Sequence, residues 1–417
     1  TILDKEAYNR ATSIYLVDRV IPMLPEKLSN KICSLRPKEE KLTFSAVFNF
    51  NEKGDIIESW FGRTIIESDY RFSYQEAQQI IETKSDKIPK EVSLKNKEYT
   101  VDKSIVEAIL ILDKIAKQKR KERENKGSIN FNKKEVSFKL NEEKDPVEII
   151  FKESKDANKL IEEFMLIANK KVAELFTEIK KQKYIYRVHD VPDIEKLKNL
   201  KHIVKGFGYA LDISSSKGIS KSLNKLLEEV KGKKEQNLIE SLALRSMSKA
   251  EYSTNNIGHY GLSFINYTHF TSPIRRYPDV LVHRLLQDVL NQQYGRYDKN
   301  LQKKSIYCSE QENTAVKAER ESIKYMQIKY MKDKIGNTYN GIISGVSDWG
   351  IYVEIEENKC EGMVYIRDIK DDKYFYNSDE QSLIGKNTKK KYQLGDPLQI
   401  EVKKADLIKK HLDFTII

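Results

Sequence analysis

The feature that most constrains the fold is an abrupt change of sequence character near Gly336. From Leu301 to about Ile335 the chain is charged and carries only a sparse apolar stripe, a pattern typical of one long, solvated connecting helix. After Gly336, short β-branched runs alternate with glycines, and about five such runs fit a small all-β barrel. The sequence therefore predicts two domains, residues 1–335 and residues 336–417.

The first domain is predicted to mix helices with antiparallel hairpins and to lack internal repeats, so the expected fold class is α+β. Alternating apolar residues on either side of a turn indicate hairpins over 42–66 and 135–151. Helical periodicity is clearest over 104–123 and 156–179. In the first of these helices the spacing gives an apolar stripe made of Ile105, Ala108, Ile109, Leu112 and Ile115.

The charge balance favours a polyanionic partner without requiring one. Lys and Arg number 74 against 63 Asp and Glu, a net charge of +11, and 23 residues are tyrosine. Cationic side chains neutralise phosphates and aromatic rings stack on bases, which suits a nucleic acid. The same lysines also serve solubility alone, so composition leaves both interpretations open.

Cysteine and histidine usage excludes several classes of protein. Cys33, Cys308 and Cys360 are far apart and form no CxxC pair, which argues against a disulfide framework or a cysteine-rich zinc site. The 6 histidines include no HExxH motif, so a zinc enzyme is not expected. No apolar run approaches the roughly 18 residues that span a bilayer. We expect a monomeric cytoplasmic protein without membrane contacts.

The segment from His259 to Leu286 is the most informative for function. Ser272 and Pro273 form a typical helix start, which would place Arg275 and Arg276 in the first turn. Cations are unfavourable there because the helix dipole is positive at that end, unless an anion such as phosphate binds. The alternative is an ordinary core helix with solvated arginines, and the residues alone favour neither. Aromatic side chains nearby that would stack on bases are Tyr260, Tyr267, Phe270 and Tyr277.

This segment also carries a family resemblance. YTHFTSPIRRYPDVLVHR, residues 267–284, resembles the C-terminal motif of the RNase II/RNase R (RNB) exoribonuclease family. The stretches 4–36, 159–169 and 186–192 are similar to other blocks of that family. The resemblance implies a hydrolase that removes nucleotides one at a time from the 3′ end of single-stranded RNA, with Mg²⁺ as cofactor.

The resemblance assigns expected roles to individual residues. Arg275 matches the arginine that holds the scissile phosphate, and Arg276 is expected to contact the substrate beside it. Tyr15 matches an aromatic residue that packs on the terminal nucleotide, and Phe131 matches the aromatic residue at the far end of the stacked bases. The two residues expected to line the catalytic cavity are Tyr74 and Glu162. From the residues alone, these aromatics would also pass as core residues.

The metal ligands of the family are not matched in this chain. They form a cluster of aspartates of the pattern DxxxxxDxDD, whereas Asp4, Asp18, Asp55 and Asp69 are isolated. In a two-metal mechanism, carboxylates fix the ions that activate water and stabilise the leaving oxygen. We therefore expect no metal ligands within this chain, and we expect the chain to be the C-terminal portion of an exoribonuclease whose Mg²⁺ ligands lie upstream.

Residues 336–417 resemble the S-one-type OB-fold RNA-binding domain, through YNGIISGVSDWGIYVEI and EGMVYIRDI. Trp349, Tyr352 and Arg367 are the expected RNA contacts. Since Trp349 and Tyr352 are three residues apart, strand alternation predicts that one of the two lies in the core.

The leading hypothesis is a processive 3′→5′ exoribonuclease closer to RNase R than to RNase II, with slight sequence preference. The alternative is a non-catalytic RNA-binding protein that keeps the RNB scaffold. A third possibility, a translation-type factor, accounts only for the barrel. The presence or absence of a DxxxxxDxDD run upstream would distinguish the first two hypotheses.

Overall fold

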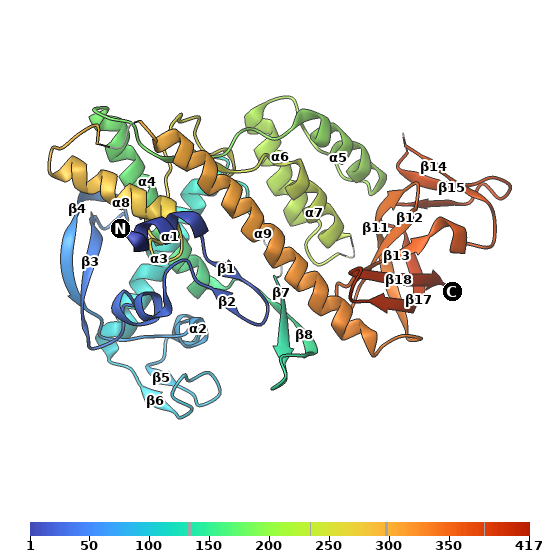
Figure 1. Cartoon of the computed structure of the whole chain (residues 1–417), viewed down its shortest axis with the longest axis horizontal. Coiled ribbons are helices and arrows are strands. Elements are labelled where there is room, and N and C mark those ends of the chain that lie inside the picture. The colour runs from blue at the N-terminus through green and yellow to red at the C-terminus, as the bar shows by residue number, and fades with distance from the viewer. Residues whose placement is uncertain (132–134, 234, 297–298, 379) are drawn as a thin grey trace.

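The computed structural model describes residues 1–131, 135–233, 235–296, 299–378 and 380–417, without the side chain of residue 217. Figure 1 shows a large body of helices and hairpins, a separate barrel, and one long helix that runs between them. The helices in the described ranges are α1 (Ile2–Arg10), α2 (Tyr74–Thr83), α3 (Lys103–Asn125), α4 (Asp156–Ile179), α5 (Ile194–Gly206), α6 (Ser216–Glu229), α7 (Gln236–Ser246), α8 (Tyr277–Leu290) and α9 (Leu301–Lys332).

The strands of the body pair as short antiparallel units. They are β1 (Ile14–Tyr15) with β2 (Val20–Ile21), β3 (Glu40–Phe50) with β4 (Ile56–Glu67), β5 (Lys87–Ile88) with β6 (Tyr99–Thr100), β7 (Glu135–Leu140) with β8 (Pro146–Lys152), and β9 (Tyr186–Val188) with β10 (Glu251–Ser253). The two predicted hairpins correspond to β3–β4 and β7–β8, and the predicted helix over 156–179 is α4. These predictions are confirmed.

The main core of the body forms around α4 and α8. Val172 and Phe176 of α4 pack with Leu281 and Leu285 of α8, and all four side chains are buried. The hairpin β3–β4 adds its Phe44 to this cluster. Because both helices are apolar along one face, they bury that face against each other and the hairpin.

Helix α3 has nearly the predicted extent, but only part of its apolar stripe is buried. Val106 and Ala116 are buried, whereas Ala108 and Leu112 of the predicted stripe are exposed. Asp113 is also buried, because it pairs with Lys117, which in turn reaches Asp156 at the start of α4. The predicted stripe is therefore only partly buried, with Ile105 and Ile109 packed against neighbouring core clusters. Ion pairs with α4, which periodicity cannot reveal, place Asp113 among the buried residues.

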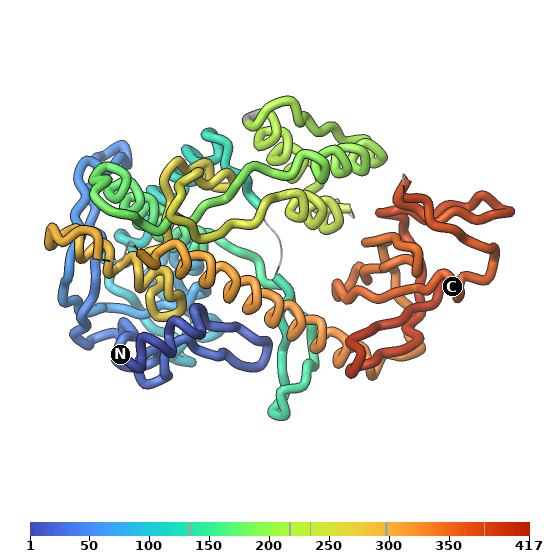
Figure 2. The backbone as a smooth tube through the Cα atoms, turned by 45° about the horizontal axis from the view of Figure 1, so that its top comes forward, coloured from blue at the N-terminus to red at the C-terminus, as the bar shows by residue number. Residues whose placement is uncertain are grey.

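Helices α5, α6 and α7 form a separate unit with its own core, which includes Leu197, Leu223 and Ile239. Figure 2 shows this group of helices between the body and the barrel. The unit contacts the barrel through Asn237 of α7, whose Nδ2 donates to the carboxylate of Glu354 at 2.7 and 2.6 Å.

The C-terminal strands close into the predicted barrel, in the order β11 (Thr338–Ser347), β12 (Gly350–Ile355), β13 (Glu361–Tyr365), β18 (His411–Ile416), β17 (Pro397–Asp406). Gly350 is required at the start of β12, since its φ is 149° and a Cβ would lie 2.1 Å from the carbonyl oxygen of Val364. A three-stranded sheet, β14 (Tyr374–Asn377), β15 (Ser382–Gly385) and β16 (Lys391–Gln393), is inserted before β17 and was not foreseen. Ile328 and Met331 of α9 enter the barrel core.

Candidate nucleic-acid interface

The two adjacent arginines of the SPIRRYPD segment have different surroundings. Helix α8 begins at Tyr277, four residues later than the Ser272 N-cap predicts, and Arg276 is its N-cap residue. Arg276 is extended because it forms an antiparallel bridge with Thr12. The predicted helix start was therefore wrong, and both arginines precede the helix. The reason is the bridge to Thr12, a residue more than 250 positions earlier in the sequence.

Asp279 organises the turn that precedes α8. Its Oδ1 accepts hydrogen bonds from the backbone N–H of Ser272 at 2.7 Å and from Nη2 of Arg276 at 2.8 Å. The Asp279 side chain is fully buried, and that of Arg276 is only 14% exposed. Arg276 thus neutralises a buried carboxylate, which leaves its predicted contact with substrate without support from this geometry.

Arg275, by contrast, points its side chain into solvent. Within the described ranges, no hydrogen bond or ion pair engages its guanidinium. Its backbone is held firmly: the carbonyl oxygen accepts from the N–H of Ser13 at 2.9 Å and from Oγ1 of Thr12 at 3.2 Å. A fixed backbone with an uncommitted guanidinium is the arrangement that binds a phosphate in a bidentate manner.

Tyr15 ends the short strand β1, two residues after Ser13, whose backbone is hydrogen-bonded to Arg275. Its side chain is 48% exposed. Its backbone N–H donates to Oε1 of Glu319 at 2.8 Å, and the N–H of Val17 donates to Oγ of Ser322 at 3.1 Å. Both acceptors belong to α9, so the connecting helix sets the position of Tyr15. Glu319 and Ser322 could not be identified from the sequence, because no local pattern links residues about 300 positions apart, 304 for Tyr15 and Glu319.

Tyr74 is the first residue of α2, directly after a capping box in which Ser73 and Glu76 bond each other's backbone N–H groups. Glu76 is buried and also accepts from the hydroxyl of Tyr99 at 2.9 Å. The Tyr74 side chain is 52% exposed. A well-capped helix therefore presents this ring to solvent rather than to the core.

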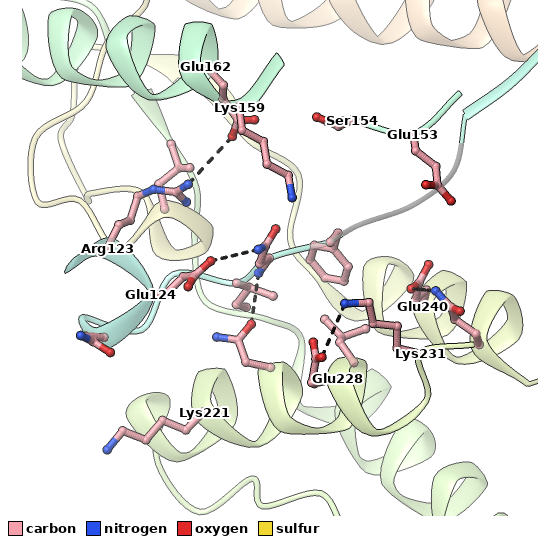
Figure 3. A pocket seen from close by; sticks show the side chains of 18 of the residues that line it. Arg123, Glu124, Glu153, Ser154, Lys159, Glu162, Lys221, Glu228, Lys231 and Glu240 are labelled. Atoms are coloured by element: carbon pink, nitrogen blue, oxygen red, sulfur yellow. Dashed lines mark hydrogen bonds and ion pairs between the residues drawn. The ribbon is translucent and has the colours of Figure 1, made fainter. Parts of the chain in front are cut away.

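A cavity of about 1180 Å³ brings Phe131 and Glu162 together, and Figure 3 shows its walls. The walls come from the end of α3, the start of α4, and α6 and α7. Arg275, Tyr15 and Tyr74 do not line this cavity, so the predicted residues divide between two places. The charged residues of the lining are Arg123, Lys159, Lys221, Lys231, Glu124, Glu135, Glu153, Glu162, Glu228 and Glu240.

Glu162 is half-exposed in the cavity wall, and Arg123 lies 3.9 Å from its carboxylate. The closer partner of Arg123 is Glu163, at 2.5 Å, whose side chain is 4% exposed. Desolvation raises the pKa of Glu163, and the hydrogen bond from Arg123 opposes that rise. Glu163 therefore anchors Arg123 in the wall, while Glu162 remains available to a ligand.

Three of the four aromatics proposed to stack near the arginines are core residues. Tyr267, Phe270 and Tyr277 are 5%, 4% and 1% exposed, so that expectation was wrong for them. They are needed instead to pack α8 and its preceding turn: Phe270, for example, stacks on His283 at a centroid distance of 4.5 Å.

The barrel exposes both of its predicted aromatic contacts. Trp349 is 70% and Tyr352 38% exposed, so the expectation that one lies in the core was wrong. Strand alternation does not apply to Trp349, which sits in the turn between β11 and β12. Arg367 lies over the ring of Tyr365, 4.8 Å from its centroid. Residues 336–417 hold 12 Lys and Arg against 14 Asp and Glu, a net −2, so the positive charge of the protein resides in residues 1–335.

The residues of these sites do not fit a divalent metal centre. Arg275 is cationic, and Tyr15 and Tyr74 are aromatic. Throughout the described ranges, no group of three or more His, Cys, Asp or Glu side chains is placed to hold a metal ion. No helix of the described chain has the length and apolar character needed to cross a membrane.

Comparisons with known proteins identify the class of this chain. The model of the RNB domain matches residues 1–292, and that of the S1 RNA binding domain matches residues 332–417. The chain belongs to the RNB family, in the arrangement of an RNB domain followed by an S1 domain. The predicted family and fold class are confirmed.

Within that family the chain is similar to proteins named Ribonuclease R. It is 38% identical to Ribonuclease R of Aquifex aeolicus, covering 100% of this chain and 58% of the relative, and 37% identical to Ribonuclease R 1 of Lactococcus lactis, covering 99% and 49%. The solved apo form of Mycoplasma genitalium RNase R matches with a TM-score of 0.90 and 30% identity, over 100% of this chain and 64% of that one. The chain thus spans about half to two thirds of these relatives.

Proposed function

We propose that the chain is the RNA-holding portion of a 3′→5′ exoribonuclease of the RNase R type, which hydrolyses RNA to nucleoside monophosphates. The observation that carries this proposal is the uncommitted guanidinium of Arg275 beside the strand that bears Tyr15. A guanidinium that can donate hydrogen bonds to a phosphate and an exposed aromatic ring lie on two segments that are joined by hydrogen bonds. This pair suits the terminal nucleotide of a single strand.

The other sites extend the same path. In this proposal Phe131 stacks on a base in the 1180 Å³ cavity, Glu162 accepts hydrogen bonds from the substrate there, and Tyr74 lines the approach to the 3′ end. Trp349 and Tyr352 on the barrel hold RNA before it enters the body. Mycoplasma genitalium RNase R has been solved in complex with ribose methylated single-stranded RNA, which supports RNA as the ligand class.

The cofactor of the proposed reaction is Mg²⁺. Since the residues described above do not fit a metal centre, we derive no chemical step through Mg²⁺ and infer that its ligands are supplied by sequence outside these 417 residues. The same inference predicts that the chain alone binds single-stranded RNA as a cytoplasmic monomer without cleaving it.

End-labelled single-stranded RNA tests the proposal. The 417-residue chain and a version extended upstream through the aspartate cluster are each incubated with RNA in Mg²⁺ or EDTA. We expect mononucleotide release only from the extended protein and only with Mg²⁺. An extended protein that binds RNA but releases no mononucleotides would favour the non-catalytic alternative. Rapid release by the 417-residue chain would show that the metal ligands lie within it.

A further inference from the structure

Phe131 is the last residue of a wall segment, residues 128–131, that belongs to no helix or strand. The ring of Phe131 is half-buried against the core of the α5–α7 unit and borders the cavity. A segment without regular structure has no repeating pattern of backbone hydrogen bonds. Other groups must therefore bond its N–H and C=O groups, and they determine where the ring lies.

Asn224 of α6 supplies that constraint on one side. Its Nδ2 donates to the carbonyl oxygen of Ser128 at 2.7 Å, and its Oδ1 accepts from the N–H of Asn130 at 3.1 Å. A carboxamide that bonds the C=O of one residue and the N–H two residues later imitates the pair of bonds a neighbouring β-strand makes. One side chain therefore fixes the backbone directly before Phe131.

The opposite side of the segment is satisfied by other groups. The N–H of Ile129 donates to the carbonyl oxygen of Gly261 at 2.9 Å, and the side chain of Asn130 donates to Oε1 of Glu124 at 3.0 Å. Figure 3 shows Glu124 on the cavity wall facing the helix that carries Lys221 and Glu228, which is α6. The segment is thus clamped between α6 and the 260–263 turn, and Asn224 is its contact with α6.

The position of Asn224 on α6 links the wall to the three-helix unit. Its neighbours Leu223, Leu226 and Leu227 are buried in the core of α5–α7, so the helix cannot rotate without breaking that core. Asn224 itself is only partly buried and lines the cavity. A rigid helix that carries one carboxamide toward a loop is suited to setting loop geometry.

We propose that Asn224 is the positioning residue for Phe131, through which the α5–α7 unit determines how RNA stacks in the cavity. Asn224 does not contact the reacting atoms in this proposal; it acts through the backbone of residues 128–130. The inference rests on the proposed function, since it assumes that Phe131 stacks on an RNA base.

A double-mutant cycle tests this proposal on the whole 417-residue chain. Asn224→Asp keeps the acceptor for Asn130 but removes the donor to Ser128 and sets two oxygens against each other. The affinity for a single strand of about 12 nucleotides, measured in EDTA, should fall about 5- to 10-fold, the scale of one lost stacking contact. In a Phe131→Ala background the same substitution should change affinity less than about 2-fold, because the group it positions is absent.

Asn199→Asp is the matched control, since Asn199 is an exposed residue of α5 and the change adds the same charge to the same unit. It should leave affinity unchanged. If Asn224→Asp fails to fold by circular dichroism, Asn224→Ser replaces it, because a hydroxyl is too short to span both backbone groups. Equal losses for Asn224→Asp with and without Phe131 would overturn the proposal while leaving the proposed function intact.

A second readout reports the ring directly. In a Phe131→Trp protein, RNA binding should quench tryptophan fluorescence more than it does in the parent, whose tryptophans are Trp60 and Trp349. Adding Asn224→Asp should reduce that quenching at saturating RNA. Unchanged quenching would overturn the positioning role. If Phe131→Ala leaves RNA affinity unchanged and RNA does not quench the Phe131→Trp protein, the assignment of Phe131 within the proposed function is refuted.

Discussion

The backbone N–H of Ser13 donates a hydrogen bond to the carbonyl oxygen of Arg275 at 2.9 Å. A second bond runs the other way: the N–H of Tyr277 donates to the carbonyl oxygen of Ala11 at 2.8 Å. These bonds join the N-terminal segment to the turn before α8. Arg276, between them, points inward to Asp279, and Arg275 points outward. The turn before α8 thus separates a structural arginine from one that is free to bind substrate.

The first prediction concerns Arg275. In an upstream-extended enzyme, Arg275→Ala should lower single-turnover RNA decay by about 10²–10³, the scale for one preorganised transition-state donor. Arg275→Lys should not restore the rate, because an ammonium lacks the bidentate geometry. The melting temperature should change little, since the side chain is exposed. RNA affinity should also change little, because many phosphates and stacked bases share the binding. Near-normal decay by well-folded Arg275→Ala protein would remove the residue from the mechanism.

The second prediction concerns Arg276, where the opposite pattern is expected. Arg276→Ala leaves the fully buried Asp279 carboxylate without its cation, and removing one partner of such a pair costs about 3–5 kcal/mol. Urea unfolding of the two alanine variants measures the difference. Equal free energies of unfolding for Arg276→Ala and Arg275→Ala would contradict the structural role of the Arg276–Asp279 pair.

The third prediction concerns the barrel. Trp349→Ala should weaken single-stranded RNA binding by about 1–3 kcal/mol, as expected for a lost base stack. The slope of log affinity against log salt should stay the same, because an aromatic side chain releases no counterions. Trp60→Ala is the control, since Trp60 is 49% exposed on β4, away from the barrel. Equal losses for the two variants would show that the barrel ring has no particular role.

The fourth prediction concerns acid stability. Burial, with a smaller contribution from the nearby His189, lowers the pKa of His259 from 6.5 to about 3. The unfolded chain therefore binds a proton at His259 below pH 6.5 that the native state refuses. The stability it contributes is fully present above that pH and is lost as pH falls toward 3.

Between pH 7 and pH 5 this loss amounts to about 2 kcal/mol for His259 alone, at 1.36 kcal/mol per pKa unit. Urea unfolding at the two pH values measures it. His259→Gln should be less stable at pH 7 and should show a smaller difference between pH 7 and pH 5. An identical pH dependence in this variant would mean that His259 is protonated in the native protein.

The elements themselves were largely predictable from local pattern. The limits of α4, the two long hairpins and the five-stranded barrel follow from apolar periodicity, capping and glycine placement, which act over a few residues. The family resemblance rests on contiguous segments such as YTHFTSPIRRYPDVLVHR, and the match to the RNB domain confirmed it.

Tertiary structure decided which faces are buried and which charges are paired. The burial of Asp113 in α3 goes with ion pairs that reach α4, and the start of α8 depends on a bridge from Thr12. The different surroundings of Arg275 and Arg276, the Glu319 contact to Tyr15, and the hold of Asn224 on the segment before Phe131 all join residues that are distant in sequence. Local propensity depends on neighbours along the chain, whereas burial and pairing depend on neighbours in space, and those exist only once the chain has folded.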